Sequence, residues 1–378
     1  MEDSPSQTPV ALVNDPPITA LGLPARDTFT DLVQDHSRFA ALVVIAAAAA
    51  ALAAPYPDIA RWLGFALAAY SIVANDSIQT VGTFIASNEQ RPWWVLWLFI
   101  GGVFLATIAY GWAVAAPAGD ISFGRLASKG FTETPQTFSY FQIAAPVVLL
   151  VLTRFRMPVS TTFLILSCFA TEAEGLRAVL EKSLWGYLIA FGFGAVLFAV
   201  TARTFQRYAK GPASPWWGPA QWLSTGVLWS SWIMQDMANL AVYLPRQLSL
   251  AEVGVFAATI FLGLGVLFFL RGDRIQRIVS EKSSVVDIRA ATLIDFVYAL
   301  ILFGFMRVST VPMSTTWVFI GLLAGRELAL ILMRAADRPL REGLKLAGRD
   351  VGLATVGLVV SILVAVAANP VVRDALFG

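Results

Sequence analysis

The chain has 378 residues, of which 57% are hydrophobic and 14% charged, with a mean hydropathy of +0.69 and a formal net charge of +2. This composition excludes an ordinary soluble domain, and apolar runs long enough for membrane helices recur throughout. The single cysteine, Cys168, excludes an intrachain disulfide, and the single histidine, His36, excludes a His-based metal site or catalytic triad inside the apolar runs.

The predicted elements begin with a polar tail over residues 1–37, rich in Pro, Asp, Ser and Thr, which we expect to be disordered and cytoplasmic. An Ala-rich transmembrane helix over 38–56 follows as an extra element. The rest divides into a first half, 57–210, and a second half, 211–378. Each half is predicted to hold two spans, the two arms of a hairpin and a final span.

The apolar segments of the first half are expected at 61–87, 93–116, 138–153, 158–171 and 183–202. Those of the second half are expected at 217–243, 251–270, 290–306, 312–333 and 350–368. At about 1.5 Å per residue, the arm at 158–171 is too short to cross a core about 30 Å thick. The paired arms therefore predict two re-entrant helical hairpins.

The number of segments also predicts the topology. Because five is odd, the second half must be inserted upside down relative to the first, and most Lys and Arg then fall on the side of the N-terminus. A basic excess marks the cytoplasmic face. We therefore expect a protein of the cell or inner membrane with its N-terminus cytoplasmic and its C-terminus outside. Inverted repeats with broken helices are the recurring plan of secondary transporters.

Two copies of the motif Pro-x-Ser-Thr-Thr, at 158–162 and 312–316, start the second arm of each predicted hairpin. Pro suits the first turn of a helix, where hydroxyls, free backbone N–H groups and the helix dipole together favour an anion. The alternative is an ordinary helix start whose hydroxyls bond back to the helix. The predicted anion ligands are Ser160, Thr161, Thr162, Ser314, Thr315 and Thr316.

Acid–amide pairs lie in the first span of each half, as Asn75-Asp76 and Gln235-Asp236. An acid at membrane depth is expected to pair with a cation or to be protonated, and amide and carboxylate oxygens suit Na⁺. The alternatives are a polar helix–helix contact and a proton relay. The predicted Na⁺ ligands are Asn75, Asp76, Gln79, Thr83, Asp236 and Asn239, and both pairs are also candidate ligands of the anion.

Asp295 is a third acid within an apolar segment, in the first arm of the second predicted hairpin. The equivalent position in the first half is Phe141. This asymmetry suggests one extra ion or proton site in one half, and an Asp held by a neighbouring polar group is the alternative.

At these motifs the chain resembles the inorganic phosphate transporter (PiT) family of Na⁺- or H⁺-coupled phosphate permeases and their sulfate-carrying relatives. The family signatures are Gly-Ala-Asn-Asp-Val-Ala-Asn-Ala-x-Gly-Thr and Pro-Val-Ser-Thr-Thr-His, which here read as 73–83 and 158–163, and the likeness covers about 60–368. The resemblance implies a homodimer. It further implies that Ser160, Thr161, Ser314 and Thr315 hold the anion, with Asn75, Asp76, Gln235 and Asp236 at the centre.

Several positions depart from the family pattern. The His that follows Ser-Thr-Thr in the family is Phe163 in one copy and Trp317 in the other, and the second family Asn is Gln79 in the first half. The Gly-Thr pair becomes Val242-Tyr243 in the second half. These changes make the site larger or more apolar, which bears on which anion it takes.

These observations predict an all-α integral membrane protein with an inverted repeat and two re-entrant hairpins. We expect a secondary active transporter of a small inorganic oxyanion, phosphate first and sulfate second, coupled to Na⁺ or H⁺ by alternating access. The lipid bilayer surrounds it, no cofactor beyond the coupling ion is expected, and nucleic-acid binding has no support. The alternatives are a sulfate or other anion permease and a passive anion channel. An enzyme is not expected, because the sequence offers no nucleophile–base pair.

Overall fold

The structure is a computed structural model, and within the ranges it describes the regular structure is helical. The chain divides into two units, residues 1–45 and 46–378, and the fold below is that of the second. The described residues are 29–88, 90–114, 118–127, 130–155, 157, 159–208, 213–269, 288–333 and 340–377.

Helix α1 (Phe29–Ala53) begins earlier than the sequence suggested. Phe29, Leu32 and Val33 recur at helical spacing, which extends the apolar stripe of the Ala-rich segment towards the N-terminus. The predicted disordered tail over 1–37 is therefore too long by the residues from 29 onwards, and its part over 1–28 lies outside the described residues.

The remaining long helices follow the apolar segments. Pro57 at the first helical position starts α2, and a capping box of Ser139 and Gln142 starts α4. In chain order the first half holds α2 (Pro57–Ser87), α3 (Trp93–Ala113), η1 (Arg125–Ala127), α4 (Tyr140–Arg154), η2 (Thr162–Leu166), η3 (Ser167–Phe169) and α5 (Ala173–Tyr208). The second holds α6 (Trp217–Asp236), α7 (Ala238–Ala241), α8 (Leu250–Phe269), α10 (Ile288–Val308), α11 (Thr315–Leu332), α12 (Leu340–Ala368) and α13 (Pro370–Phe377).

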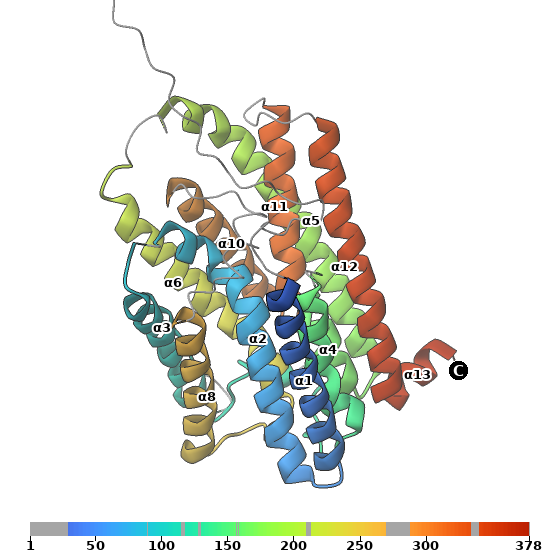
Figure 1. Ribbon diagram of the computed structural model, residues 1–378. Helices are drawn as coiled ribbons and strands as arrows, with labels where there is room; N and C mark the ends of the chain where they lie inside the picture. The colour runs from blue at the N-terminus through green and yellow to red at the C-terminus, as the bar shows by residue number, and fades with distance from the viewer. Residues whose placement is uncertain are drawn as a thin grey trace, which may run out of the picture. The chain divides into compact units, whose positions relative to one another are not determined.

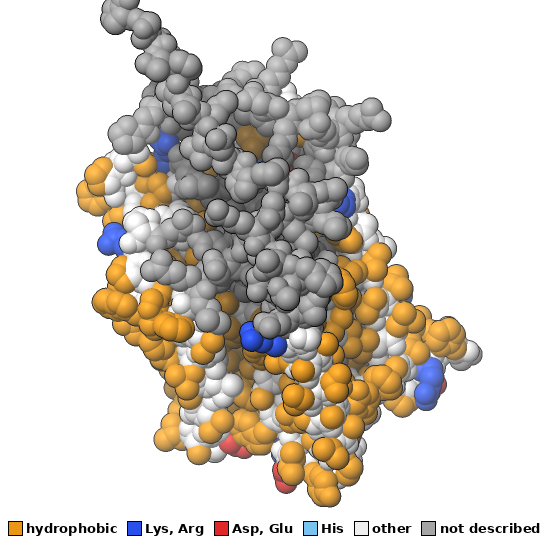
Figure 2. All heavy atoms as spheres, viewed as in Figure 1, with side chains coloured by type: hydrophobic (Ala, Val, Ile, Leu, Met, Phe, Trp, Pro, Cys, Tyr) orange, Lys and Arg blue, Asp and Glu red, His pale blue; other side chains and the backbone are white. Residues whose placement is uncertain are grey.

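Among the described residues, six helices are long and apolar enough to cross a membrane: α3, α5, α8, α10, α11 and α12. Their outward faces are apolar, as on α8, where Leu262, Val266 and Phe269 are each about three-fifths exposed. Figure 2 shows such side chains gathered along the flanks of the molecule. Because exposed apolar bands of this extent are costly in water, this surface is that of an integral membrane protein.

The segment that follows α4 is short. After Arg154 the next helical structure is one π-helical turn, η2, followed by one 3-10 turn, η3, which ends at Phe169. Its counterpart in the second half, α11, is a full helix of 18 residues. The two arms that carry the Ser-Thr-Thr motifs therefore differ in length and regularity.

The last long helix of each half packs against the other half. Helix α4 packs on α2, and α10 packs on α6, within their own halves. In contrast, α5 packs along α11, whereas α12 packs on η2 and η3 (Figure 1). Helices α3 and α8 also pack on each other. This reciprocal arrangement ties the two motif-bearing arms to helices that lie far away in the sequence.

Glycines allow α5 and α11 to approach closely. A Cβ added at Gly321 would collide with the main-chain oxygen of Tyr187, and one added at Gly325 with that of Phe191. From the other side, Gly194 faces the main-chain oxygen of Leu322. Small residues at such positions let backbones meet in membrane proteins, where packing rather than the hydrophobic effect holds helices together.

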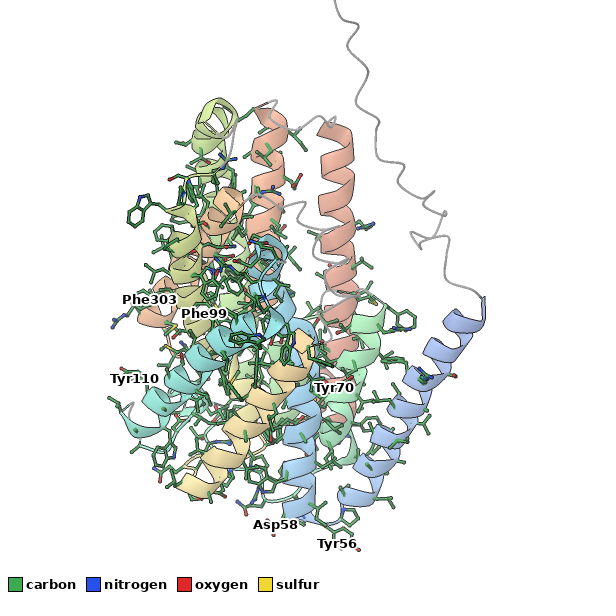
Figure 3. All side chains as sticks on the ribbon, turned by 60° about the vertical axis from the view of Figure 1, so that its left-hand side comes forward. Tyr56, Asp58, Tyr70, Phe99, Tyr110 and Phe303 are labelled. Atoms are coloured by element: carbon green, nitrogen blue, oxygen red, sulfur yellow. The ribbon has the colours of Figure 1, made fainter. Side chains whose placement is uncertain are left out.

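Aromatic side chains fill the space between α2, α3 and α6. Phe99 packs against Phe84 and Trp222, with ring centroids 5.5 and 4.7 Å away (Figure 3). Further along α6, Trp229 and Trp232 stack at 4.8 Å and are both fully buried. The contacts of Phe99 and Phe84 with Trp222 hold α6 against α2 and α3, and α6 carries the Gln235-Asp236 pair at its C-terminal end.

Candidate functional site

The first acid of the site, Asp76, lies in the middle of α2 and is 2% exposed. Its Oδ1 accepts a hydrogen bond from Asn75 Nδ2 at 2.6 Å, and its Oδ2 accepts one from the hydroxyl of Thr161. Thr161 comes from the first Ser-Thr-Thr motif. The structure thus brings the acid–amide pair and the hydroxyl motif of the first half into direct contact.

The second acid, Asp236, is the last residue of α6 and is 1% exposed. Its Oδ1 accepts from Asn239 Nδ2 at 2.9 Å, and the hydroxyl of Thr315 lies near its carboxylate. Asp76 is close enough to act on it electrostatically. The helix is interrupted here, between Asp236 and Ala238, so the expected single span over 217–243 is two consecutive helices.

The two hydroxyl motifs are bonded to each other in a reciprocal way. Thr162 Oγ1 donates to the main-chain oxygen of Met313 at 3.2 Å, and Thr316 Oγ1 donates to that of Val159 at 3.4 Å. In both bonds the last Thr of one motif reaches the residue before the Ser of the other. The aromatic residues that follow the motifs, Phe163 and Trp317, also meet, with ring centroids 5.4 Å apart.

Ser160 and Ser314 play equal local roles. The Oγ of Ser160 accepts from the backbone N–H of Phe163, and that of Ser314 accepts from Trp317, both at 3.2 Å. Each serine thereby satisfies a donor at the start of its arm. Within the described ranges no acceptor takes the hydroxyl hydrogen of either serine. Two hydroxyl donors, one from each half, are left for another molecule.

Three buried oxygens near Asp236 have no hydrogen-bond partner in the described part of the chain. They are Oε1 of Gln235, Oδ2 of Asp236 and Oδ1 of Asn239. The side-chain amide nitrogens of Gln235 and Asn239 do have partners. Gln235 Nε2 donates to the main-chain oxygen of Leu302 at 3.3 Å, and Asn239 Nδ2 also donates to Thr162. A buried acceptor without a partner is costly, and carboxylate and amide oxygens are the type of ligand that a hard cation prefers.

Asp295 lies apart from this set, on α10. Its two oxygens accept hydrogen bonds from Thr83 at 2.7 Å and from Thr225 at 2.5 Å, which come from α2 and α6. The structure therefore places Thr83, expected to share an ion with Asp76, beside Asp295. The side chain of Gln79 and the residue Pro158 lie outside the described residues.

Two basic residues that the motifs gave no reason to select border the site. Arg125 of η1 donates to the main-chain oxygens of Met234 at 3.3 Å and Ser309 at 2.8 Å. Burial lowers the pKa of Arg125 to about 10, and attraction to Asp236 opposes that shift, so the guanidinium stays charged at neutral pH. Lys182 of α5 donates to the main-chain oxygens of Ser309 and Val311. Both lay in segments without a polar repeat, and sequence offered no signal for them.

No family model and no curated protein matches this chain. Among solved structures, it is similar to one described as the sodium-dependent phosphate transporter, with a TM-score of 0.53 and 17% sequence identity. The match covers 84% of this chain and 98% of that one. At this identity the similarity shows the fold alone, which this chain shares with that structure.

Proposed function

We propose that the chain is a secondary active transporter that moves a small inorganic oxyanion, phosphate first, together with Na⁺. The observation that carries this proposal is the meeting of both Ser-Thr-Thr motifs and both acids at one place. Thr161 bonds Asp76, Thr162 bonds Met313, and Asn239 bonds both Asp236 and Thr162. A site built from both halves of a chain is what alternating access requires.

The anion would be held mainly by hydroxyl groups rather than by formal charge. Ser160 and Ser314 each have a hydroxyl hydrogen that no described acceptor takes, whereas the hydroxyls of Thr162 and Thr316 join the two arms. Ser314 also begins a full helix, whose N-terminal dipole favours negative charge. Neutral donors let the anion leave again, because they bind it less tightly than a buried cation would.

The unpartnered oxygens of Gln235, Asp236 and Asn239 support Na⁺ as the coupling ion. A cation there would neutralise Asp236 and attract the anion held at the serines nearby. In the first half, both oxygens of Asp76 already accept hydrogen bonds. The second half therefore offers the more open cation site. The similar solved structure is described as sodium-dependent, which agrees with this assignment.

Protons are the alternative coupling ion, and Asp295 is the acid that would serve them. It is buried and bonded only to the hydroxyls of Thr83 and Thr225 among the described residues. Such hydroxyls can donate to a carboxylate or accept from a carboxylic acid without moving. An exchangeable proton at Asp295 would make transport respond to a proton gradient.

We further propose that residues 57–210 and 211–378 form inverted repeats whose motif-bearing arms belong to re-entrant hairpins. The reciprocal bonds of Thr162 and Thr316 support this, as does the packing of α5 on α11 and of α12 on η2 and η3. Homodimer formation and a cytoplasmic N-terminus follow from the family resemblance and the distribution of basic residues.

The test is uptake of radiolabelled phosphate into proteoliposomes with an inward Na⁺ gradient, an inward H⁺ gradient or neither. We compare the wild type with Asp76→Asn and with Asp58→Asn. Asp58 is the matched control because it lies on the same helix, exposed at its start (Figure 3), where it pairs with Arg61. Uptake that follows the Na⁺ gradient, is lost in Asp76→Asn and is kept in Asp58→Asn supports the proposal.

Other outcomes would change the proposed function. Uptake that follows only the H⁺ gradient and is lost in Asp295→Asn assigns the coupling to protons. Uptake of sulfate but not phosphate changes the substrate and keeps the mechanism. Rapid flux that ignores both gradients identifies a passive anion channel and overturns the transporter.

A further inference from the structure

Two cationic side chains meet at the turn between α10 and α11, immediately before the second Ser-Thr-Thr motif. Arg125 Nη1 lies 2.8 Å from the main-chain oxygen of Ser309, and Lys182 Nζ lies 3.0 Å from the same oxygen. Lys182 also donates to the main-chain oxygen of Val311. Because both nitrogens contact one atom, the two positive charges are close neighbours.

Such a pair is unfavourable by itself, since like charges repel and partial burial strengthens the repulsion. Arg125 is 3% exposed, and Lys182 is partly buried in α5. Within the described ranges Lys182 donates to main-chain carbonyl oxygens and forms no ion pair. The carbonyl dipoles, together with the attraction of Arg125 to Asp236, offset part of the cost of bringing two cations together, and an anion between them would offset more.

The pair is also adjacent to the transport site on two sides. Arg125 bonds the carbonyl of Met234, directly before Gln235 and Asp236. Lys182 precedes Ser183, whose Oγ accepts from the backbone N–H of Ser314 at 2.8 Å. An anion held between the two cations would therefore stand next to the second motif without occupying it.

We propose that Lys182 and Arg125 form a separate oxyanion-binding subsite that holds the transported anion before it reaches Ser160 and Ser314. The subsite would take a tetrahedral or planar oxyanion such as phosphate or sulfate. The anion replaces the carbonyls of Ser309 and Val311 as the acceptor for the two cations. It thereby also frees the turn that precedes Ser314, which couples anion arrival to movement of the second motif.

This inference rests on the proposed function, and the experiment separates the two. We measure the phosphate concentration dependence of Na⁺-driven uptake into proteoliposomes for the wild type, Lys182→Met, Lys182→Gln, Lys182→Arg and Arg177→Met. Arg177 is the matched control, because it lies on α5 and its exposed side chain pairs with Glu181. Lys182→Gln keeps a donor for the carbonyls and removes the charge.

We expect the KM for phosphate to rise about tenfold in Lys182→Met and Lys182→Gln with a smaller change in kcat, as for loss of one charged hydrogen bond. Lys182→Arg should restore most of the affinity, and Arg177→Met should match the wild type. If Lys182→Met does not fold, Lys182→Gln carries the test, since it keeps the turn bonded.

Two results would overturn the subsite. In the first, the wild type transports phosphate and both neutral variants keep its KM. In the second, Lys182→Gln keeps the wild-type KM while Lys182→Met fails, which makes the contact a structural latch. A wild type that neither binds nor transports phosphate or sulfate refutes the proposed function instead. Scintillation binding of labelled phosphate to the detergent-solubilised protein identifies that case.

Discussion

The hydroxyl of Thr162 donates to the main-chain oxygen of Met313, and Thr316 returns the same bond to Val159. These two bonds link motifs that lie in different halves of the sequence. They also decide which hydroxyls remain for a ligand, because the two threonines are used in joining the arms. The bonds therefore make the two arms one structural unit at the centre of the fold.

Removing one of these bonds should lower stability. Thr162→Val keeps the shape of the side chain but removes the hydroxyl that bonds the main-chain oxygen of Met313, and it leaves the amide of Asn239 with Asp236 as its remaining acceptor. We expect a loss of about 1 to 3 kcal/mol, seen as a lower midpoint of thermal unfolding in detergent. Thr259→Val is the control, since its hydroxyl bonds Val255 on an exposed helix face. Equal midpoints for the two variants would contradict the linking role.

Ser314→Ala should weaken anion binding more than it weakens the fold. The change removes both the cap of α11 and a hydroxyl assigned to the anion. Loss of the cap costs about 1 kcal/mol. Ser139→Ala controls for this, because Ser139 caps α4 through the same contact to the third residue of the helix. We expect the KM for phosphate to rise about tenfold in Ser314→Ala only. A similar KM in both variants would remove Ser314 from the anion site.

Asn239→Leu tests the cation site of the second half. It removes one of the three unpartnered oxygens and the donor to Asp236, at similar side-chain size. We expect the Na⁺ concentration for half-maximal phosphate uptake to rise about tenfold or more, because only the oxygens of Gln235 and Asp236 would remain to hold the ion. The measurement is uptake over a range of Na⁺ at saturating phosphate. An unchanged Na⁺ dependence with a raised phosphate KM would instead assign Asn239 to the anion.

Gly325→Ala should separate α5 from α11. An added methyl group would collide with the main-chain oxygen of Phe191. This is a backbone atom, which cannot rotate out of the way as a flexible side chain can. We expect a loss of about 1 to 3 kcal/mol, as for overpacking elsewhere. Gly192→Ala is the control on the facing helix, where the added atom meets nothing within 4 Å. Thermal unfolding of both variants checks this, and a stable Gly325→Ala would show that the helices can part without cost.

Much of the helical framework could be predicted from the sequence, because apolar runs are a strong signal in membrane proteins. The expected segments over 93–116 and 251–270 correspond closely to α3 (Trp93–Ala113) and α8 (Leu250–Phe269). The expected final span at 183–202 is longer in the structure, since α5 starts at Ala173 with a charged first turn that carries Glu174. Charged residues end an apolar run but do not end a helix.

The residues that the structure brings together could be predicted from the sequence where a motif was repeated. Repetition singled out Asp76, Asp236 and both Ser-Thr-Thr sequences, which the structure brings together. The sequence could not predict which of their hydroxyls join the two arms and which remain for a ligand. That depends on which main-chain carbonyl of the opposite arm lies within hydrogen-bond distance. The sequence did not point to Arg125 and Lys182 because they bond main-chain oxygens. Every residue carries such an oxygen, so no residue type marks these contacts.

The exchange of helices between the halves constrains how the protein is made. The first motif, at 158–162, leads into η2 and η3, and the helix that packs on these two turns, α12, is among the last parts of the chain to be synthesised. When the first half has been synthesised, α12 does not yet exist to pack on η2 and η3, and α11 does not yet exist to pack on α5. We therefore expect that neither half folds by itself, that the two arms come together only after translation is nearly finished, and that a chain that stops before residue 340 does not assemble them.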